Sequence, residues 1–372
     1  MGGIVHIVNS DFGYGYNLAV HSLKIAEGLD RREDLVVLCR TAAADARDFA
    51  DVRRLGLGRT AGLALKALNR YVTRRVAYRH IESRFFEASL GRTLRRLPWD
   101  SISVVHAWSS FPSLLADVKE QHPGILFIKD QTMATGDSPS DRAELRADLE
   151  VYDLFFSPSP FVSRSLEAAG VPAQRIVEIP YGVDPEEFRP RAAGATASGA
   201  GFRAAFSGLL CARKGIPTLL EAWKSLRLPG ASLHLYGRVD PPLSGLLREA
   251  AHHGVVVHGF VDLRSELPLN DLFVFPTRWE GSAKSVYEAL ACGLPVITTP
   301  QAGSVVQDGV QGFVVPSDDV TGLAAKIRFF YENPEERKRF SAAARAQGER
   351  YSWERYARSV LAAYHREVPR LS

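Results

Sequence analysis

Two glutamates, Glu280 and Glu288, lie eight positions apart in a segment that joins one apolar stretch to another. A carboxylate only accepts hydrogen bonds and can take two hydroxyl groups at once, so it suits the neighbouring hydroxyls of a sugar or a ribose. Eight residues of helix span on the order of 12 Å. The pair therefore predicts a site with a sugar near one carboxylate and a ribose near the other. Two solvated glutamates are the plain alternative.

A helix is expected between the two glutamates. Ala283, Val286 and Leu290 recur at helical spacing on one apolar face, and a glycine and a proline follow as a helix stop. The N–H groups at the start of a helix have no partner within it and form the positive end of its dipole, so they attract anions. Glu280 would precede this helix and Glu288 would lie within it, with a diphosphate at the helix start.

Arg213 and Lys214 form a second candidate site. They follow an apolar stretch, 202–208, that is typical of a buried strand, and they precede the amphipathic segment 216–226. Two fixed cations at the start of a helix suit a diphosphate, because its charge is met by side chains and backbone N–H groups together. The sequence therefore predicts a strand, a basic loop and a helix that bind phosphate.

The length and composition favour an α/β protein with two domains. The chain has 372 residues, of which 46% are hydrophobic, and a formal net charge of +4. Cys39, Cys211 and Cys292 are far apart and lack metal-ligand spacing, so we expect reduced, structural thiols. The first residues form a strand that is too short for a signal sequence or a membrane span. These features predict a cytoplasmic protein, and the Ala and Arg content favours a bacterial source.

The N-terminal segment reads as strand, loop, helix and strand, at 4–8, 11–17, 18–29 and 35–39. This order predicts a parallel sheet, whose ligands bind at the carboxyl ends of its strands. Gly13 and Gly15 lie in that first loop. They also fit a dinucleotide-binding turn, with Arg40 placed for a 2′-phosphate. However, four residues separate the expected strand from Gly13, whereas the dinucleotide fingerprint follows its strand at once.

Residues 51–100 are strongly basic, with twelve Lys or Arg against four acids. Leu, Ala, Val, Tyr and Phe are interleaved, which indicates one or two basic amphipathic helices of the kind that lie on anionic membrane surfaces. An ordinary arginine-rich helix face exposed to water is the alternative. Nucleic acid binding is a poorer interpretation, because no nucleic-acid motif accompanies the charge.

Two series of buried strands follow, separated by a segment without periodicity. In the first series, the strand 103–108 carries His106 near its carboxyl end. A lone histidine is more often a satisfied core residue than a ligand contact, but strand ends are where such sheets bind ligands. Residues 189–201, rich in Ala, Gly, Ser and Pro, form the expected domain boundary. A second series begins at 202, and Ser352 is the expected N-cap of the last helix.

Several of these segments agree with one family. The sequence resembles the retaining, nucleotide-sugar-dependent glycosyltransferases of family 4, which have the GT-B architecture of two facing Rossmann-like α/β domains with a deep cleft between them. The matching segments, in family order, are 179–190, Arg213-Lys214-Gly215, 280–295 with its two glutamates, 309–316 and Trp353. The likeness is strong over about 150–372 and weaker over 1–50 and 101–130. Each motif is weak alone, whereas five in this order are specific.

The resemblance implies a role for each candidate. Lys214, with Arg213, would hold the donor diphosphate, Glu288 would bind the nucleotide ribose, and His106 would lie near the transferred sugar. The remaining residues of the implied site are Glu280, Gly281, Ser282, Ala283 and Lys284 at the sugar, and Gly13, Gly15 and Gly208 at the phosphates. It further implies an N-terminal acceptor-binding domain at 1–188, a linker at 189–201, a donor-binding domain at 202–352, and a last helix, 353–372, that crosses back to the first domain.

The sequence departs from the family pattern at four places, one of which is Ser304 in the position of a conventional glutamate. The arginine that often follows the glycine of the first donor-domain strand is Leu209 here, and we expect Arg213 to supply its charge. The usual Gly-Phe-Gly after the first glutamate is Gly-Ser-Ala, and Lys284 stands where an apolar residue is common. The segment between Gly259 and Leu272 is a few residues short, which leaves the wall for the nucleobase undefined.

We therefore expect transfer of a hexose-type sugar from a nucleoside diphosphate sugar to an acceptor hydroxyl, with retained configuration. No cofactor or metal is expected, since the chain has no Asp-x-Asp cluster. The donor base stays open among UDP, GDP and ADP, and the basic stretch favours a glycan or lipid-linked acceptor at the inner membrane face. Three alternatives stay open: an epimerase or sugar-phosphate enzyme on the same fold, an NADP-binding oxidoreductase, and a non-catalytic sugar-nucleotide sensor.

Overall fold

The chain folds into two compact units. The structure, a computed structural model, describes residues 3–12, 21, 24–25, 27–28, 35–42, 51–55, 78–136, 138–191 and 201–368. Unit 1 contains Met1–Ser157, Ser165–Ile179 and Tyr356–Ser372, and unit 2 contains Pro158–Arg164 and Pro180–Arg355. Each unit is built on one parallel sheet.

Unit 1 holds a sheet of seven strands. They are β1 (Gly3–Phe12), β2 (Leu35–Ala42), β3 (Asp51–Arg54), β4 (Ile102–Ala107), β5 (Leu126–Asp130), β6 (Leu154–Ser157) and β7 (Ile176–Glu178). Their order in the sheet is β3-β2-β1-β4-β5-β6-β7, and all neighbours are parallel. The chain therefore starts in the middle, at β1, winds outward through β2 and β3, and then returns to β4 to wind the other way. This is the doubly wound order of a Rossmann-like domain.

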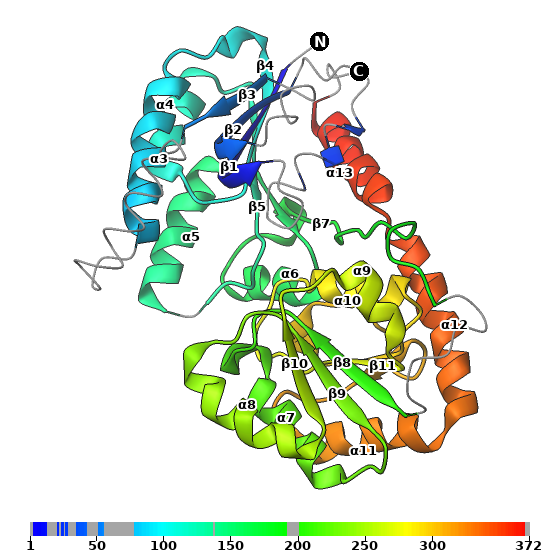
Figure 1. Ribbon diagram of the computed structural model, residues 1–372. Coiled ribbons are helices and arrows are strands. Elements are labelled where there is room, and N and C mark those ends of the chain that lie inside the picture. The colour runs from blue at the N-terminus through cyan, green and yellow to red at the C-terminus, as the bar shows by residue number, and fades with distance from the viewer. Residues whose placement is uncertain are drawn as a thin grey trace. The chain divides into compact units, whose positions relative to one another are not determined.

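Helices cover both faces of this sheet, as a parallel sheet requires, because the strands are apolar on both sides. The helices with printed bounds here are α3 (Tyr78–Leu94), α4 (Pro112–Gln121), α5 (Pro139–Val151), α6 (Pro160–Ala168) and α13 (Trp353–Glu367), and His21, Lys24, Ile25 and Glu27 are also helical. The first residues of α6, up to Arg164, belong to unit 2. In Figure 1, α3, α4 and α5 lie on one side of the strands and α13 on the other. The last helix thus completes the first unit from residue Tyr356 onward.

Unit 2 repeats the same plan with six strands. They are β8 (Arg203–Ser207), β9 (Ser232–Tyr236), β10 (Val255–Gly259), β11 (Leu272–Phe275), β12 (Val296–Thr298) and β13 (Gly312–Val314). The helices between and after them are α7 (Ile216–Leu226), α8 (Ser244–Ala250), α9 (Leu263–Glu266), α10 (Lys284–Ala291), α11 (Val320–Glu332) and α12 (Pro334–Arg350). The sheet order is β10-β9-β8-β11-β12-β13, with α7 packed on α11 and α10 on α12. The order again reverses between the first strand, β8, and the fourth, β11.

The basic stretch 51–100 is not helical throughout. Its first residues form the strand β3, which pairs in parallel with β2. Residues 56–77 lie outside the described residues, and α3 follows. The apolar side chains of α3, Phe86, Leu90 and Leu94, are buried. Its arginines Arg84 and Arg92 are exposed. Because its apolar face is already used for packing, α3 has the features of a solvated arginine-rich face.

The segment 180–188 belongs to unit 2, whereas the sequence placed it in the N-terminal domain. Its contacts explain this. Val183 forms a parallel bridge with Ser352, and the guanidinium of Arg345 on α12 donates to the carbonyls of Pro185 and Phe188. Ser352 also caps the last helix, since its Oγ accepts from the backbone N–H of Arg355 at 3.2 Å. Local composition shows where a linker starts, but these distant contacts decide which unit holds a segment.

The cysteines agree with the sequence. Cys39, Cys211 and Cys292 are buried and no disulfide joins them, as expected of structural thiols. Within the described ranges, no helix is both long enough and apolar enough to cross a membrane.

Candidate functional site

The candidate site of unit 2 lies at the carboxyl ends of β8 and β11. These strands are neighbours, and the winding direction changes between them. Loops that leave such a pair diverge to opposite faces of the sheet, which opens a crevice where ligands bind. Arg213 and Lys214 lie in the loop after β8, in a 3-10 turn, Ala212–Lys214. Glu280 lies in the loop after β11, before α10.

Lys214 and Arg213 converge on one carboxylate oxygen. The Nζ of Lys214 lies 2.9 Å from Oε2 of Glu280, and Nη1 of Arg213 lies 3.3 Å from the same atom. Arg213 also donates to the carbonyl of Trp279. The side chains of Lys214 and Glu280 are only 17% and 14% exposed, so water screens their attraction incompletely. A carboxylate thus lies between two cations at the place where the fold expects a ligand.

Glycines allow this close approach of the two loops. Gly215 has a φ of +73°, and a Cβ there would lie 1.9 Å from the carbonyl oxygen of Pro276. Gly208 has a φ of +139°, and a Cβ there would lie 3.3 Å from Nζ of Lys214. Both positions combine a backbone conformation that favours glycine with a space that a side chain would fill. Gly208 therefore serves to seat Lys214.

Hydrogen bonds to three other segments of the chain hold the loop that carries Glu280. The backbone N–H of Arg278 donates to the carbonyl of Arg213 at 2.9 Å, and the N–H of Glu280 donates to the carbonyl of Gln301 at 3.1 Å. Oγ of Ser159 donates to the carbonyl of Gly281 at 2.7 Å, within unit 2. These bonds hold the main chain around Glu280 before any ligand binds.

The helix α10 begins with donors that its own sequence leaves free. It starts at Lys284, and Ala283 occupies the N-cap position. Alanine has no side-chain oxygen that could accept from the first-turn N–H groups. The hydroxyl of Ser282, which could act as a cap, lies instead 3.0 Å from the hydroxyl of Tyr287. The start of α10 therefore keeps its capacity to bind an anion or sugar hydroxyls.

Glu288 and Lys284 face each other one turn apart on α10. Burial raises the pKa of Glu288 to about 7, and the nearby ammonium of Lys284 opposes part of this rise. Burial also lowers the pKa of Lys284, and the carboxylate of Glu288 opposes that shift. A buried carboxyl group with a pKa near neutrality is a candidate for a functional role.

His106 lies inside unit 1, where its side chain is fully buried. Its Nδ1 is 2.6 Å from the hydroxyl of Tyr364 on α13, and that hydroxyl is 3.2 Å from Nε2 of His6. Its Nε2 is 3.5 Å from Oδ2 of Asp130. Its ring stacks on Trp108, with 4.0 Å between the ring centroids.

These surroundings are those of a core histidine. Burial lowers the pKa of His106 to about 3 and raises that of Asp130 to about 8, so the imidazole is neutral at neutral pH. The contact of His106 with a sugar, which the resemblance implies, is not available in this conformation. The ring is enclosed because period-two alternation along β4 turns His106 and Trp108 to the same buried face.

The other N-terminal candidates cannot be placed in the same way. Gly13 and Gly15 lie outside the described residues. The strand β1 runs to Phe12, so Gly13 follows it at once, and the spacing argument against a dinucleotide turn was wrong. Arg40, however, is ion-paired with Glu82 at 3.0 Å, with both side chains mostly buried, and is not held open for a 2′-phosphate.

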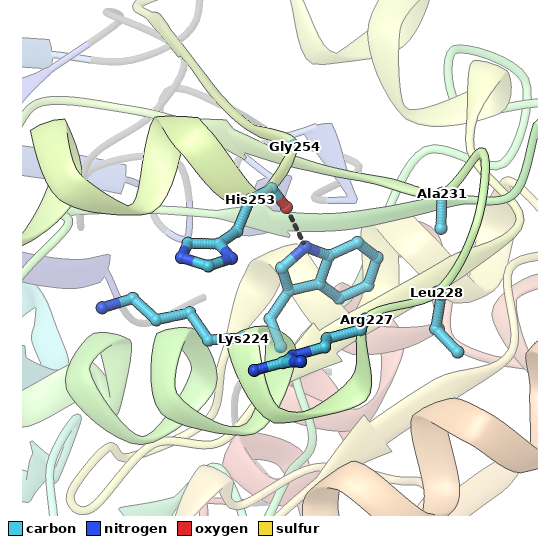
Figure 2. Close-up of a pocket in the computed structure, with 7 residues that line it drawn as sticks. Lys224, Arg227, Leu228, Ala231, His253 and Gly254 are labelled. Carbon is cyan, nitrogen blue, oxygen red and sulfur yellow. Dashed lines mark hydrogen bonds between the residues drawn. The ribbon is translucent and has the colours of Figure 1, made fainter.

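A hollow of about 300 Å³ lies elsewhere in unit 2. The indole N–H of Trp223 donates to the carbonyl of His253 at 3.0 Å. Lys224, Arg227 and His253 are labelled in the view of this hollow in Figure 2. These residues lie at the last turn of α7 and at the start of β10, which is the amino end of the strands. Cations at the end of a helix stabilise its dipole. We therefore assign Lys224 and Arg227 a structural role.

In the part of the chain that the structure describes, no group of three or more His, Cys, Asp or Glu side chains is placed to hold a metal ion.

Comparison with known proteins decides the family. A model described as Glycosyltransferase Family 4 matches residues 18–187, and one described as Glycosyl transferases group 1 matches residues 201–333. Between them they span both units. The chain belongs to glycosyltransferase family 4.

Curated members of family 4 are distant relatives. The D-inositol 3-phosphate glycosyltransferase of Geodermatophilus obscurus is 29% identical over 64% of this chain and 58% of its own length. The corresponding protein of Arthrobacter sp. is 26% identical over 65% of this chain and 63% of its own length. The putative colanic acid biosynthesis glycosyltransferase WcaL of Salmonella typhimurium is 26% identical over 48% and 47%. The chain thus spans about three fifths of the inositol-phosphate relatives that it matches.

Solved structures agree with family 4 in fold. The Anabaena protein Alr3699/HepE, in complex with UDP and glucose, matches 98% of this chain and 99% of its own, with a TM-score of 0.72 and 15% identity. The sucrose-phosphate synthase of Thermosynechococcus elongatus matches all of both chains, with a TM-score of 0.76 and 18% identity. At such identities the likeness shows the fold, which is GT-B.

The structure brings together only part of the residue set that family 4 implies. Lys214, Arg213 and Glu280 meet, with Gly208 beneath Lys214. Sequence reasoning missed the bonds of Ser159 and Gln301 to this loop. It missed them because neither residue lies in a local pattern; only the folded backbone places them there.

Proposed function

We propose that the protein is a retaining glycosyltransferase that moves a sugar from a nucleoside diphosphate sugar to an acceptor hydroxyl, in the synthesis of a bacterial cell-envelope glycan or glycolipid. The donor binds unit 2 and the acceptor binds unit 1. Membership in family 4 supports the reaction class. UDP-sugars are the first donors to test, because a structural neighbour is described in complex with UDP and glucose.

One observation carries this proposal: Lys214 and Arg213 share Oε2 of Glu280 at the carboxyl ends of β8 and β11. The two cations are held in place by their loop, and the first-turn N–H groups of α10 lie at the end of the same loop as Glu280. In our proposal the donor diphosphate displaces the carboxylate from the two cations. Glu280 is then free to accept hydrogen bonds from hydroxyls of the transferred sugar.

Glu288 would bind the ribose. Its carboxylate can accept from both vicinal hydroxyls, and the backbone of Gly281, Ser282, Ala283 and Lys284 would contact the sugar. Gly13 and Gly15 would face the phosphates from unit 1. His106 acts in our proposal from within the core, by holding the end of β4 in shape, since its ring is enclosed.

In the chemical step, the bond between the anomeric carbon and the β-phosphate oxygen breaks and its electron pair goes to the phosphate. The acceptor oxygen forms the new bond on the same face of the sugar, and its proton goes to the leaving phosphate. Lys214 and Arg213 stabilise the negative charge that develops on the leaving group. In this assignment Glu280 orients the transferred sugar and does not act as a nucleophile.

The test is a panel of UDP-, GDP- and ADP-sugars, with release of the nucleoside diphosphate as the readout. We expect Lys214→Ala and Glu288→Ala to lower kcat/KM by about 100-fold or more, in line with the loss of a preorganised charge at such a site. Lys224→Ala is the matched control, because Lys224 is ion-paired with Glu249 on α7 and α8, away from the site. Near-normal turnover of Lys214→Ala would refute the assignment. If, among UDP, GDP, ADP and NADP, only NADP raises the Tm of the protein, the function is refuted.

The stereochemistry and the site of action need their own measurements. Proton NMR of the first-formed glycoside distinguishes retention from inversion, and inversion would overturn the proposed mechanism. The membrane association proposed for 51–100 is tested by flotation with anionic vesicles, before and after Arg70, Arg74 and Arg75 are replaced. If the wild-type chain is absent from the floated fraction, the membrane interpretation of 51–100 fails. The interpretation as a solvated helix face, as in α3, then stands.

A further inference from the structure

Unit 1 contains a polar pocket that none of the motifs described above includes. It has a volume of about 100 Å³ and is lined by Lys129, Gln131, Ala134, Thr135, Gly136, Asp141, Glu144, Leu145 and Asp148. These residues come from the end of β5, from the loop after it and from α5. The pocket is thus at the carboxyl end of a central parallel strand, the edge at which doubly wound sheets bind ligands.

The floor of the pocket is a buried ion pair. Nζ of Lys129 contacts Oδ2 of Asp148, whose side chain is fully buried. Oδ1 of Asp148 accepts from Oγ of Ser110 at 2.6 Å. Burial raises the pKa of Asp148, and Lys129 opposes this rise. The charge of Lys129 is thus consumed by the protein, and it offers no free cation to a phosphate.

The walls carry carboxylates that are less engaged. Oε1 of Glu144 lies 3.4 Å from Lys129, but 58% of the Glu144 side chain is exposed. Asp141 caps α5 and accepts from Ser138 through Oδ2. The lining thus holds three acidic side chains against one basic one, and both Glu144 and Asp141 have acceptor capacity beyond these contacts.

A further polar atom beside the pocket has no partner in the protein. Thr135 lines the pocket, and its hydroxyl is buried and has no hydrogen-bond partner among the described residues. Buried hydroxyls are normally paired, so an unpaired one calls for an explanation. A hydroxyl group bound in the pocket would supply the bond once the Thr135 side chain turns toward it.

We infer that this pocket is the acceptor subsite, and that it takes a hydroxyl-rich, non-anionic sugar or polyol unit, uncharged or amine-bearing. The inference rests on the proposed function. Carboxylate acceptors attract the O–H and N–H donors of such a unit. The excess negative charge repels a phosphate or carboxylate group at the same place. A lipid with an anionic group would then lie farther along the acceptor, away from this pocket.

The experiment compares acceptors with the same donor. Myo-inositol and glucose are the neutral probes, and inositol 1-phosphate and glucose 6-phosphate are their anionic counterparts. Glucosamine is the amine-bearing probe. We expect acceptor kcat/KM to be at least about tenfold higher for the non-anionic member of each pair, as one close charge interaction provides. A wild-type preference for the phosphorylated members would overturn the inference.

Variants then assign the effect to the pocket. Glu144→Gln is expected to raise the KM for the neutral acceptor by about tenfold and to narrow the discrimination against phosphate, because one negative charge is lost. Thr135→Val should raise the KM for the neutral acceptor and leave the preference for neutral over phosphorylated acceptors unchanged. Glu150→Gln is the matched control, since Glu150 is an exposed glutamate of the same helix that does not line the pocket. An acceptor KM that is equal in Glu144→Gln and Glu150→Gln would overturn the subsite.

Failure of the proposed function has a different signature. If wild-type protein releases no nucleoside diphosphate from any donor, with or without acceptor, then the glycosyltransferase proposal itself fails. If it releases nucleoside diphosphate but the pocket variants keep wild-type acceptor constants, then only the subsite fails.

Discussion

Lys214 and Glu280 form an ion pair of 2.9 Å between Nζ and Oε2, although they belong to loops that follow different strands, β8 and β11. The pair matters because Arg213 shares the same oxygen, so the carboxylate occupies both cations that we assign to the donor diphosphate. An anion of the protein thus competes with an anion of the substrate, and this competition can be measured.

Replacing Glu280 by glutamine should separate donor affinity from turnover. The variant frees Lys214 and Arg213, so we expect nucleoside diphosphate to bind about three- to tenfold more tightly, which corresponds to about 1 kcal/mol for a partly exposed ion pair. Turnover should fall, because the sugar loses its orienting carboxylate. Isothermal titration with UDP, GDP and ADP, together with kcat, checks both. Unchanged or weaker nucleotide binding would show that Glu280 does not occupy the diphosphate site.

Donor affinity should depend on pH through Glu288. Burial raises its pKa from 4.5 to about 7, so the carboxyl is largely protonated below pH 7. A ribose that donates two hydrogen bonds prefers the ionised form, so the donor KM should fall as the pH rises from 6 to 8 and then level off. At the low end the affinity should drop by up to about tenfold per pH unit. Glu288→Gln should flatten this profile.

The same shift affects stability with the opposite sign. Because the folded-state pKa of Glu288 lies above its unfolded value, this group favours folding most at low pH, and that contribution is lost as the pH rises through about 7. Bound donor should offset the loss. Thermal unfolding should therefore show a larger donor-induced rise in Tm at pH 8 than at pH 6, and an equal rise at both values would contradict the ribose assignment.

Tyr364→Phe should destabilise unit 1. The hydroxyl of Tyr364 is within hydrogen-bond distance of both His6 and His106, and its removal leaves two buried imidazole nitrogens without this partner. We expect a loss of about 1–3 kcal/mol in the free energy of unfolding, measured with urea. The control is Tyr331→Phe, which removes one exposed bond to the carbonyl of Pro229 and should cost less than about 1 kcal/mol. Equal losses would show that the buried cluster contributes nothing special.

Gly215→Ala should damage the donor site through the backbone. A Cβ at this position would collide with the carbonyl of Pro276, and the φ of +73° disfavours alanine in any case. The loops that carry Lys214 and Glu280 would be pushed apart, so we expect donor KM to rise by about tenfold or more and stability to fall by over 1 kcal/mol. Gly245→Ala in α8, where a Cβ has open space, should instead stabilise slightly. Wild-type kinetics in Gly215→Ala would show that the loops tolerate the shift.

The sequence predicted the fold class and most strands, because a parallel sheet buries its strands on both faces and leaves apolar runs that are easy to recognise. The stretch 202–208 contains β8, Arg203–Ser207, and the helix expected at 216–226 agrees with α7 to the residue. The strand β3 was mistaken for helix, since its Asp-Val-Arg-Arg sequence has few buried side chains at the sheet edge. Edge strands carry weak patterns, which limits what periodicity can show.

The candidate site could be predicted where its residues lie in local sequence motifs. It could not be predicted where residues far apart in the chain come together. The meeting of Lys214 with Glu280 followed from two loops at a switch point. The enclosure of His106 did not, because Tyr364 and Asp130 lie far from it in sequence. The pocket beneath Glu144 was likewise hidden, since its residues come from a polar loop and a helix without a motif.

The last helix has a consequence for biosynthesis. Unit 1 consists of three segments, and the third, Tyr356–Ser372, leaves the ribosome after everything else described here. Unit 2 takes nearly all of its residues from one continuous segment, Pro180–Arg355, so it is complete in sequence before the last segment of unit 1 is made. The nascent unit 1, by contrast, must wait with His6 and His106 lacking Tyr364. Until its last segment packs, unit 1 exposes part of its parallel sheet. This partly folded form of the protein is the one that most needs a chaperone.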